Sequence, residues 1–254
     1  MSMNTSTLKN DNDKFYNIAN DWWDKNGKFE SLHKFSDIRI KFITMFIRKY
    51  HKIDALKPLK KLDCLDVGCG GGILTERLFR LGGNVTGIDV TKNSIKTAND
   101  HAKKSNLKIN YLNLNMNSFK KKFPKKQFDL IIASEVIEHV DNRTEFFSQV
   151  SKLLKNKGIL ILTTINRTPQ SFFLAKLLAE KIFNLLPDDI HDFDKFVSPE
   201  ELMEEAKSFN IHFNDLIGFK PILTLSKKLK PRISNFIFTN NVKVNYGICG
   251  IKLI

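Results

Sequence analysis

The stretch KLDCLDVGCGGGILTERLFRLGGNVTGID, residues Lys61 to Asp89, decides the fold. It begins with Leu62 to Val67, a short apolar run that is typical of a buried parallel strand. The glycines at 68, 70, 71 and 72 then allow a sharp turn and the close approach of a ligand. Apolar residues at helical spacing lead to Gly82-Gly83, and a second strand ends in Asp89. The stretch therefore predicts an α/β, Rossmann-like fold that binds a nucleoside cofactor.

Two acidic residues indicate which cofactor binds there. Asp89 follows the glycine loop by about twenty residues, where a carboxylate accepts hydrogen bonds from a ribose diol. Asp66 precedes the loop, where it would repel a pyrophosphate but suits the ammonium and sulfonium groups of S-adenosylmethionine. A dinucleotide fingerprint would also need a small residue in place of Ile73. We expect S-adenosylmethionine, rather than NAD, to bind at Asp66, Gly68, Gly70 and Asp89.

Length and composition limit the class of protein. The chain has 254 residues, so we expect one domain over 14–254 after a polar, disordered start at 1–13. Its three cysteines are too few and too scattered for a disulfide framework or a zinc site. The first residues lack the features of a secretory or organellar presequence, and no apolar run approaches the roughly 20 residues that span a bilayer. These features favour a cytoplasmic protein, attached at most to a membrane surface.

The formal net charge of +14 admits nucleic acid or anionic lipid as a partner. Lysine provides most of this charge, in runs with few aromatic residues between them. Solvated lysine faces explain such runs better than a nucleic-acid site, so we expect no nucleic acid to bind.

The most informative chemistry follows a fourth buried strand, Phe128 to Ala133. Ser134 lies at its carboxyl end, and Glu135, Glu138 and His139 then stand at i, i+3 and i+4, so a helical turn would bring all three to one side. They can hold Mg²⁺ or Zn²⁺, or serve as a general base. The alternative is that Glu135 contacts the cofactor while Glu138 and His139 are structural.

Further site residues lie elsewhere in the chain. A helix expected over Ile38 to Tyr50, capped by Ser36 or Asp37, places Arg39 to bind a cofactor carboxylate. Asn115 and Met116, after a third strand, offer a polar and an apolar contact to adenine. His191, in an acidic loop, is a second candidate to take a proton from a phenol, although a surface histidine is the plain alternative.

Three other segments complete the picture. Phe15 to Trp23 predicts a helix that either packs on the core or forms a lid over the ligand. Ser171 to Leu186 is apolar over most of its circumference and suits lying in a membrane interface or capping the active site. Two closing strands, Ile211 to Phe219 and Val242 to Ile251, are joined by a basic loop over 220–241.

The chain resembles the ubiquinone-biosynthesis O-methyltransferase family. The likeness is carried by DVGCGGGILTE, VTGID, EVIEHV, TTINRTPQS, HDFDKF and VNYGI, together with FYNIANDWWD and FESLHKFSDIRI, in that family's order. It extends from about Phe15 to Lys252, which is nearly the whole chain.

The resemblance implies a seven-stranded, mostly parallel sheet flanked by helices, with N-terminal helices and a helical insertion at about 168–197. It implies S-adenosylmethionine-dependent methylation of catechol-type hydroxyls on polyprenylated rings, 2-polyprenyl-6-hydroxyphenol and 3-demethylubiquinol. Cofactor contacts then fall on Arg39, Gly68, Asp89 and Ser134. A divalent cation would be held at Glu135, Glu138 and His139.

The resemblance also implies partners and location. Residues 171–186 would touch anionic membrane lipid at the inner membrane, and other ubiquinone-biosynthesis enzymes are further expected partners. Two other kinds of function stay open: a methyltransferase that acts on RNA or another small phenolic molecule, and a lipid-binding scaffold without catalysis.

Overall fold

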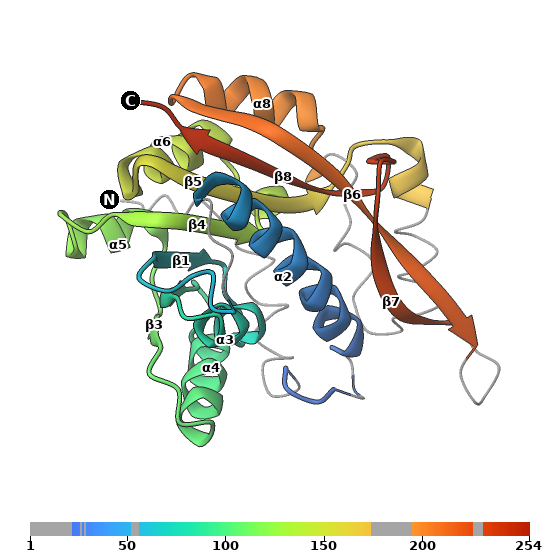
Figure 1. Ribbon diagram of the computed structural model, residues 1–254, viewed down its shortest axis with the longest axis horizontal. Coiled ribbons are helices and arrows are strands. Elements are labelled where there is room, and N and C mark those ends of the chain that lie inside the picture. Colours follow the sequence, from blue (N-terminus) through green and yellow to red (C-terminus); the bar gives the residue numbers. More distant parts are fainter. Residues whose placement is uncertain (1–21, 26, 28, 52–55, 174–194, 226–230) are drawn as a thin grey trace.

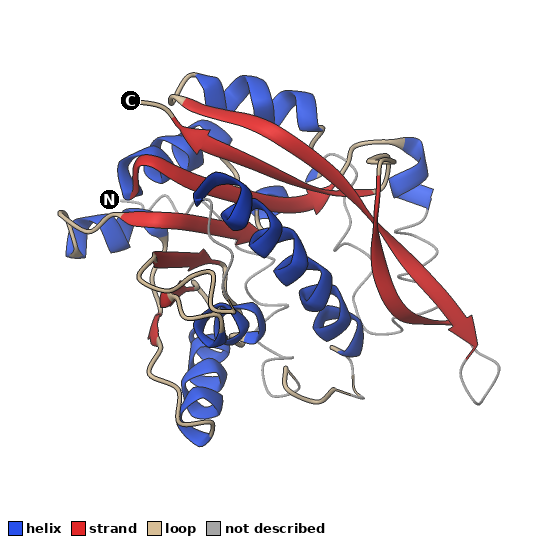
Figure 2. Ribbon diagram, viewed as in Figure 1, coloured by secondary structure: helices blue, strands red, loops and turns tan. Residues whose placement is uncertain are grey.

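A twisted sheet with helices on both faces forms the protein, as the computed structural model in Figures 1 and 2 shows. The structure describes residues 22–25, 27, 29–51, 56–173, 195–225 and 231–254. The predicted disordered start, most of the predicted first helix and almost all of 171–186 lie outside these residues.

The sheet has eight strands within the described residues, in the order β3-β2-β1-β4-β5-β8-β6-β7. The strands are β1 (Asp63–Val67), β2 (Asn84–Ile88), β3 (Asn110–Leu112), β4 (Phe128–Ser134), β5 (Leu154–Ile165), β6 (Ile211–Leu225), β7 (Pro231–Thr239) and β8 (Asn245–Lys252). The five strands from β3 to β5 are parallel, whereas β8 runs antiparallel to both β5 and β6, and β7 runs antiparallel to β6. Strands β2 and β3 lie on one side of β1, whereas β4 and β5 lie on the other, so the strand order reverses between β1 and β4. Ligands of open α/β sheets bind at such a point.

The helices divide between the two faces of the sheet. They are α2 (Glu30–His51), α3 (Ile73–Arg80), α4 (Lys92–Lys104), α5 (Met116–Lys122), the short 3₁₀ helix η2 (Ile137–His139), α6 (Arg143–Leu153) and α8 (Pro199–Lys207). Helices α2 and α3 cover one face, and α5, α6 and α8 cover the other.

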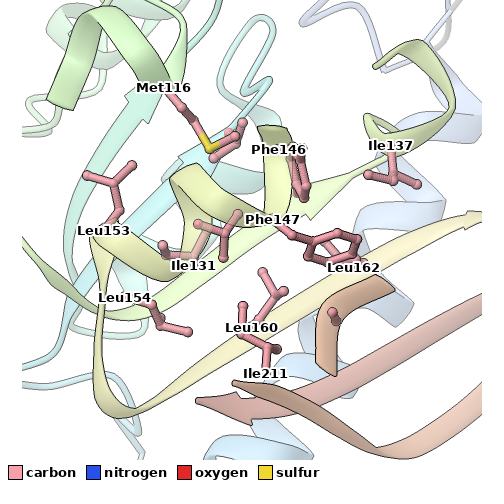
Figure 3. Close-up of a cluster of buried hydrophobic side chains, with 14 of the residues drawn as sticks. Met116, Ile131, Ile137, Phe146, Phe147, Leu153, Leu154, Leu160, Leu162 and Ile211 are labelled. Atoms are coloured by element: carbon pink, nitrogen blue, oxygen red, sulfur yellow. The ribbon is translucent and has the colours of Figure 1, made fainter. Parts of the chain in front are cut away.

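Successive side chains of β4 pack alternately into the two halves of the core, one on each face of the sheet. Leu130 and Ile132 pack with side chains of α2 and α3, whereas Ile131 and Ala133 pack with side chains of α5, α6 and α8. Successive side chains of a strand point to opposite faces, so a strand covered on both sides reads as a continuous apolar run. Figure 3 shows the second half of the core, where Phe146 and Phe147 of α6 lie against the strands.

The predicted fold class is confirmed, with three corrections. The first is the strand count, because β7 adds an eighth strand to the predicted seven. The second concerns 220–241, which was expected to be a loop but instead holds the end of β6 and all of β7. Lysines and Pro221 interrupt the alternation of apolar and polar residues that would have predicted strands in 220–241. Ile233, Phe236 and Phe238 nevertheless stand two or three residues apart. The rings of Phe236 and Phe238 contact phenylalanine rings of α2.

The third correction concerns the start of α2. The helix begins at Glu30, ahead of the predicted Ser36 or Asp37 cap. The Ser36 hydroxyl donates to the Leu32 carbonyl at 2.8 Å, so a residue typical of helix starts is satisfied inside the helix. Arg39 consequently lies within the helix rather than at its start.

Cys64, Cys69 and Cys249 are all buried and free, and burial raises the pKa of each thiol above its usual value. Among the helices that the structure describes, none combines the length and the apolar character needed to cross a membrane.

The core should be sensitive to truncation at Phe147. Its ring is fully buried and lies 5.5 Å from the ring of Phe146, centroid to centroid. Phe147→Ala leaves a cavity and should lower the free energy of unfolding by about 3–5 kcal/mol in denaturant titrations. Phe173→Ala is the matched control, because that ring is 67% exposed, and it should change stability by less than about 0.5 kcal/mol. Equal losses in the two variants would contradict this description of the core.

Candidate active site

The glycine loop lies at the carboxyl end of β1 and is closely covered. Gly68 has φ +66°, and a Cβ at this position would lie 2.5 Å from Val136 Cγ2, in the loop that follows β4. Gly70 has φ +52°, and a Cβ there would lie 2.5 Å from the ring of Trp22. Both positions therefore require glycine, and the loop is held between the β4 loop and a tryptophan.

The two tryptophans cover this loop. Trp22 lies over Gly70 and Gly71 and stacks on Phe29 at 4.5 Å. The Trp23 indole donates to the Gly71 carbonyl at 2.9 Å, and its ring stacks on His101 at 3.4 Å. Trp22 also packs with Ile73 in a small buried cluster, so it covers the glycine loop and belongs to the core at once. Residues 15–21 of the predicted helix lie outside the described residues.

Asp89 lies at the end of β2 and accepts two backbone hydrogen bonds. Its carboxylate accepts from Gly70 N at 2.9 Å and from Thr91 N at 2.7 Å. Burial raises the pKa of Asp89, while these two N–H groups act in the opposite direction. The carboxylate thus bridges the glycine loop and the start of α4, which is the position expected for a ribose-binding group.

Arg39 is a buried cation with unused donors. Its side chain is 4% exposed, and the guanidinium lies 3.9 Å over the ring of Phe35. Within the described residues, Nε and Nη2 of Arg39 have no hydrogen-bond partner. Burial lowers the pKa of Arg39 to about 10, against the opposite influence of Glu135, Asp66 and Glu138, so it remains charged at neutral pH.

Such an arrangement is costly without a ligand. A buried polar donor without a partner carries a desolvation penalty of about 1–3 kcal/mol, and more when it is charged. A ligand carboxylate that accepts from Nε and Nη2 would remove this penalty, and the fork of the guanidinium matches a carboxylate in geometry.

Asp66, which precedes the glycine loop in the sequence, is a buried acidic residue that interacts electrostatically with Arg39. It is 2% exposed and accepts a hydrogen bond from the Thr75 hydroxyl at 2.6 Å. Burial raises the pKa of Asp66 to about 7, although Thr75 and Arg39 lower it. The Asp66 carboxyl group can therefore gain or lose its proton near neutral pH, and a nearby positive ligand would favour the ionised form.

Glu135 and Glu138 are bonded to neighbouring threonines of β5. Thr163 donates to Glu135 at 2.8 Å, and Thr164 donates to Glu138 at 2.8 Å. Burial raises the pKa of each carboxyl to about 7, and for Glu135 the charge of Glu138 adds to the effect. Carboxyl groups with such values can hold or accept a proton near neutral pH.

The helical turn expected for this segment is wrong. Glu135 has φ +55°, its backbone N–H bonds to Thr163, and only Ile137–His139 form the short helix η2. Glu135 therefore lies before the turn. In the part of the chain that the structure describes, no three His, Cys, Asp or Glu side chains group as metal ligands, and this includes Glu135, Glu138 and His139.

The remaining predicted residues have the following places. Asn115 caps α5 by accepting from Ser118 N at 2.8 Å, and Met116 lies in the core with 6% exposure (Figure 3). The Ser134 hydroxyl shares a hydrogen bond of 2.6 Å with the Thr163 hydroxyl. His191 lies outside the described residues.

Several site residues escaped sequence reasoning. Thr75, Thr163 and Thr164 donate to the carboxyl groups of Asp66, Glu135 and Glu138, and the His101 ring stacks on Trp23. Thr163 and Thr164 could have been predicted as site residues, because they form a pair at the carboxyl end of a parallel strand, where ligands bind. No signal linked His101 to Trp23, because the contact depends on the path of the N-terminal segment.

Comparisons with known proteins agree with this geometry. Residues 65–162 match the family described as a methyltransferase domain. The ubiquinone biosynthesis O-methyltransferase of Pelagibacter ubique is 43% identical over 243 residues, which cover 95% of this chain and 96% of that protein. The protein of the same name from Rickettsia prowazekii is 36% identical, with 96% and 91% covered.

Solved structures show the same fold at low identity. Magnesium protoporphyrin IX methyltransferase from Synechocystis, solved with bound SAH, aligns with a TM-score of 0.62 at 14% identity and covers 95% of this chain and 97% of that one. The plantazolicin methyltransferase BpumL aligns with a TM-score of 0.60 at 15% identity, with 97% and 100% covered. The sheet and helices therefore form the class I methyltransferase fold.

The raised pKa of Asp66 predicts a pH dependence of stability. An aspartate has a pKa of about 3.9 in the unfolded chain, whereas the pKa of Asp66 in the folded protein is about 7. Between these values the folded state binds more protons, so the free energy of unfolding of the ligand-free protein falls as pH rises through this window. Asp66→Asn removes this contribution and should flatten the decline in denaturant titrations.

Glu204→Gln is the control for this measurement, because the Glu204 side chain is 80% exposed. It should keep the wild-type decline. If Asp66→Asn kept the same decline as well, the proposed burial of a partly neutral carboxyl group would be wrong.

Proposed function

Since the chain belongs to the ubiquinone biosynthesis O-methyltransferase family, we propose a specific assignment of its site to the reaction of that family. The enzyme transfers a methyl group from S-adenosylmethionine to a catechol-type hydroxyl in ubiquinone biosynthesis. The proposed acceptors are 2-polyprenyl-6-hydroxyphenol and 3-demethylubiquinol.

The observation that carries the assignment is the buried Arg39 guanidinium, whose Nε and Nη2 have no hydrogen-bond partner among the described residues. It interacts electrostatically with the carboxyl groups of Glu135, Asp66 and Glu138. S-adenosylmethionine has one carboxylate and two cationic groups, so it complements both kinds of charge in this site. Arg39 would bind the carboxylate, Asp66 would face the positive groups, and Asp89 would hold the ribose. Gly68 to Gly72 would lie under the methionyl part, and Asn115 and Met116 would contact the adenine. Ser134 is a further proposed cofactor contact.

When bound, the cofactor supplies an activated methyl group, so the protein must align the acceptor oxygen and remove its proton. A phenol has a pKa near 10, so its ionisation at neutral pH costs about 4 kcal/mol. Glu138 has a pKa of about 7 and is adjacent in sequence to His139, which makes these two the candidate bases among the described residues. His191 is the third candidate.

A divalent cation at Glu135, Glu138 and His139 is a second, separate proposal. The three side chains do not form a ligand group in this conformation, so we assign no step to a cation. Burial raises the pKa of Glu135 and the charge of Glu138 raises it further. The support for this proposal is that a cation between the two carboxyl groups would relieve their repulsion.

The acceptor ring carries a long apolar tail, so its source is the bilayer. Residues 171–186 are the proposed contact with anionic lipid at the inner membrane, and other enzymes of ubiquinone biosynthesis are proposed partners. At the described edge of this segment, Phe172 and Phe173 are exposed, which supports the proposal.

A methylation assay tests the activity directly. With a short-chain demethylated quinol and S-adenosylmethionine, we expect a product heavier by one methyl group on a ring oxygen. Methylation of RNA, but not of the quinol, would instead favour a nucleic-acid enzyme. Liposome binding without any response to the cofactor would favour a scaffold. Chelator and added Mg²⁺ form further arms, and equal turnover in all of them would overturn the cation proposal.

The role of Arg39 predicts a loss of cofactor affinity. A hydrogen bond to a charged group contributes about 1.5–3 kcal/mol, so Arg39→Gln should raise the Kd of S-adenosylmethionine by about 10- to 100-fold in calorimetry. The unfolding temperature of the ligand-free protein should change little, because the variant removes a buried charge whose Nε and Nη2 have no hydrogen-bond partner among the described residues. Arg80→Gln is the control, with a side chain 58% exposed on the neighbouring helix. Unchanged affinity in Arg39→Gln would refute the carboxylate assignment.

A further inference from the structure

Phe35 of α2 is the aromatic neighbour of Arg39 and precedes it by about one helical turn. Residues four apart lie on the same side of a helix, and the Arg39 guanidinium carbon lies over the Phe35 ring, 3.9 Å from its centroid. Both side chains are buried, with Phe35 8% exposed and Arg39 4% exposed. A cation within about 6 Å of a ring centroid is attracted by the negative face of the ring. The protein therefore holds the arginine of the candidate site by an aromatic face.

A phenylalanine ring suits this arginine better than a carboxylate would. A carboxylate directly against the guanidinium would accept from its N–H groups and would compete with a ligand carboxylate for them. A phenylalanine side chain has no such acceptor, and a guanidinium can stack on it while its N–H groups stay available. Among the described residues, Nε and Nη2 of Arg39 have no hydrogen-bond partner. The contact with Phe35 thus restrains the guanidinium without using these two donors.

The Phe35 ring is itself held by strands β6 and β7. It meets the Phe219 ring of β6 edge to face, with the centroids 5.4 Å apart, and it packs on the Phe236 ring of β7 at 4.8 Å. Next to it in the sequence, Lys34 donates to the Ile233 carbonyl of β7 at 2.6 Å. Figure 1 shows the first turns of α2 beside β7. The ring is therefore fixed on the side that faces the strands.

We propose that Phe35 is a positioning residue for the cofactor, because its ring orients the Arg39 guanidinium so that Nε and Nη2 face the carboxylate of S-adenosylmethionine. This rests on the proposed function, which assigns that carboxylate to Arg39. An arginine side chain has several rotatable bonds, and ordering them when a ligand binds costs free energy. The ring imposes the order before the cofactor arrives, so Phe35 increases the affinity through Arg39.

The competing explanation is that Phe35 only holds α2 in place. Phe42 distinguishes the two explanations, because it lies on the same helix, is fully buried and meets the same Phe219 ring at 5.4 Å. The ring that lies under the guanidinium is Phe35 and not Phe42. Truncation of either ring removes packing from α2, whereas truncation of Phe35 alone should release Arg39.

Calorimetry with the full chain tests the proposal with two ligands. One is S-adenosylmethionine, and the other is its decarboxylated form, which keeps the sulfonium and the amine but has no carboxylate. Phe35→Leu should raise the Kd of S-adenosylmethionine about tenfold and leave that of the decarboxylated form nearly unchanged. Phe35→Tyr keeps the aromatic face and should restore most of the affinity. Phe42→Leu is the matched control, and it should lower the unfolding temperature while leaving both Kd values nearly unchanged.

A double-mutant cycle with Arg39→Gln gives a second measurement. In that background, Phe35→Leu should cause no further loss of affinity for S-adenosylmethionine, because the ring then has no guanidinium to orient. Additive losses in the cycle would overturn the proposal. An unchanged Kd in Phe35→Leu, or an equal loss in Phe42→Leu, would do so as well. Circular dichroism at the temperature of the titration checks the fold of each variant.

Turnover of the short-chain quinol separates this proposal from the proposed function. Phe35→Leu should raise the KM for S-adenosylmethionine by a larger factor than it lowers kcat, because saturating cofactor compensates for a loosely held Arg39. Absence of methylation by the wild-type protein would reject the proposed function, while the comparison of the two ligands would still decide the role of Phe35. An active enzyme whose Phe35→Leu variant binds the cofactor as tightly as the wild type would reject the positioning role alone.

Discussion

The active site depends on one arrangement of charge: a cationic guanidinium enclosed with three carboxyl groups where little water reaches. Each of these groups is costly to bury alone. Burial raises the pKa of Asp66, Glu135 and Glu138 to about 7, and each carboxyl group accepts a hydrogen bond from a threonine hydroxyl, which reduces this cost. Among the described residues, Nε and Nη2 of Arg39 nevertheless have no hydrogen-bond partner. The site is therefore arranged for a ligand that brings charges of both signs, and an amino-acid zwitterion with a sulfonium group is such a ligand.

The fold makes this arrangement possible by gathering parts that are distant in sequence. Asp66 comes from the end of β1, Glu135 follows β4, and the threonines end β5, so parallel pairing brings all of them to one edge. Arg39 comes from a different layer, through α2. The contact of Gly68 with the Val136 side chain fixes the loops after β1 and β4 against each other. The register of the sheet thus sets the relative positions of Asp66, Glu135 and the threonines, whereas α2 sets the position of Arg39.

Sequence reasoning succeeded where chemistry follows a local pattern. The glycine turn after β1 and the position of Asp89 at the end of β2 each depend on a few adjacent residues. It failed where long-range packing decides. Ser36 has the properties of a helix cap, yet Phe35 and Phe42 pack on β6 and β7, and this packing places Ser36 inside a longer helix. The positive φ of Glu135, which separates it from the η2 turn, also has no local sequence signal.

The burial of the cysteines has a practical consequence for studying this protein. Thiol-specific reagents attack the thiolate, and a raised pKa together with burial withholds that form at Cys64, Cys69 and Cys249. The natural chain therefore serves as an unreactive background for site-directed labelling. A single exposed cysteine introduced by substitution could carry a fluorophore or spin label, and its signal would report on that one position without removal of any native sulfur.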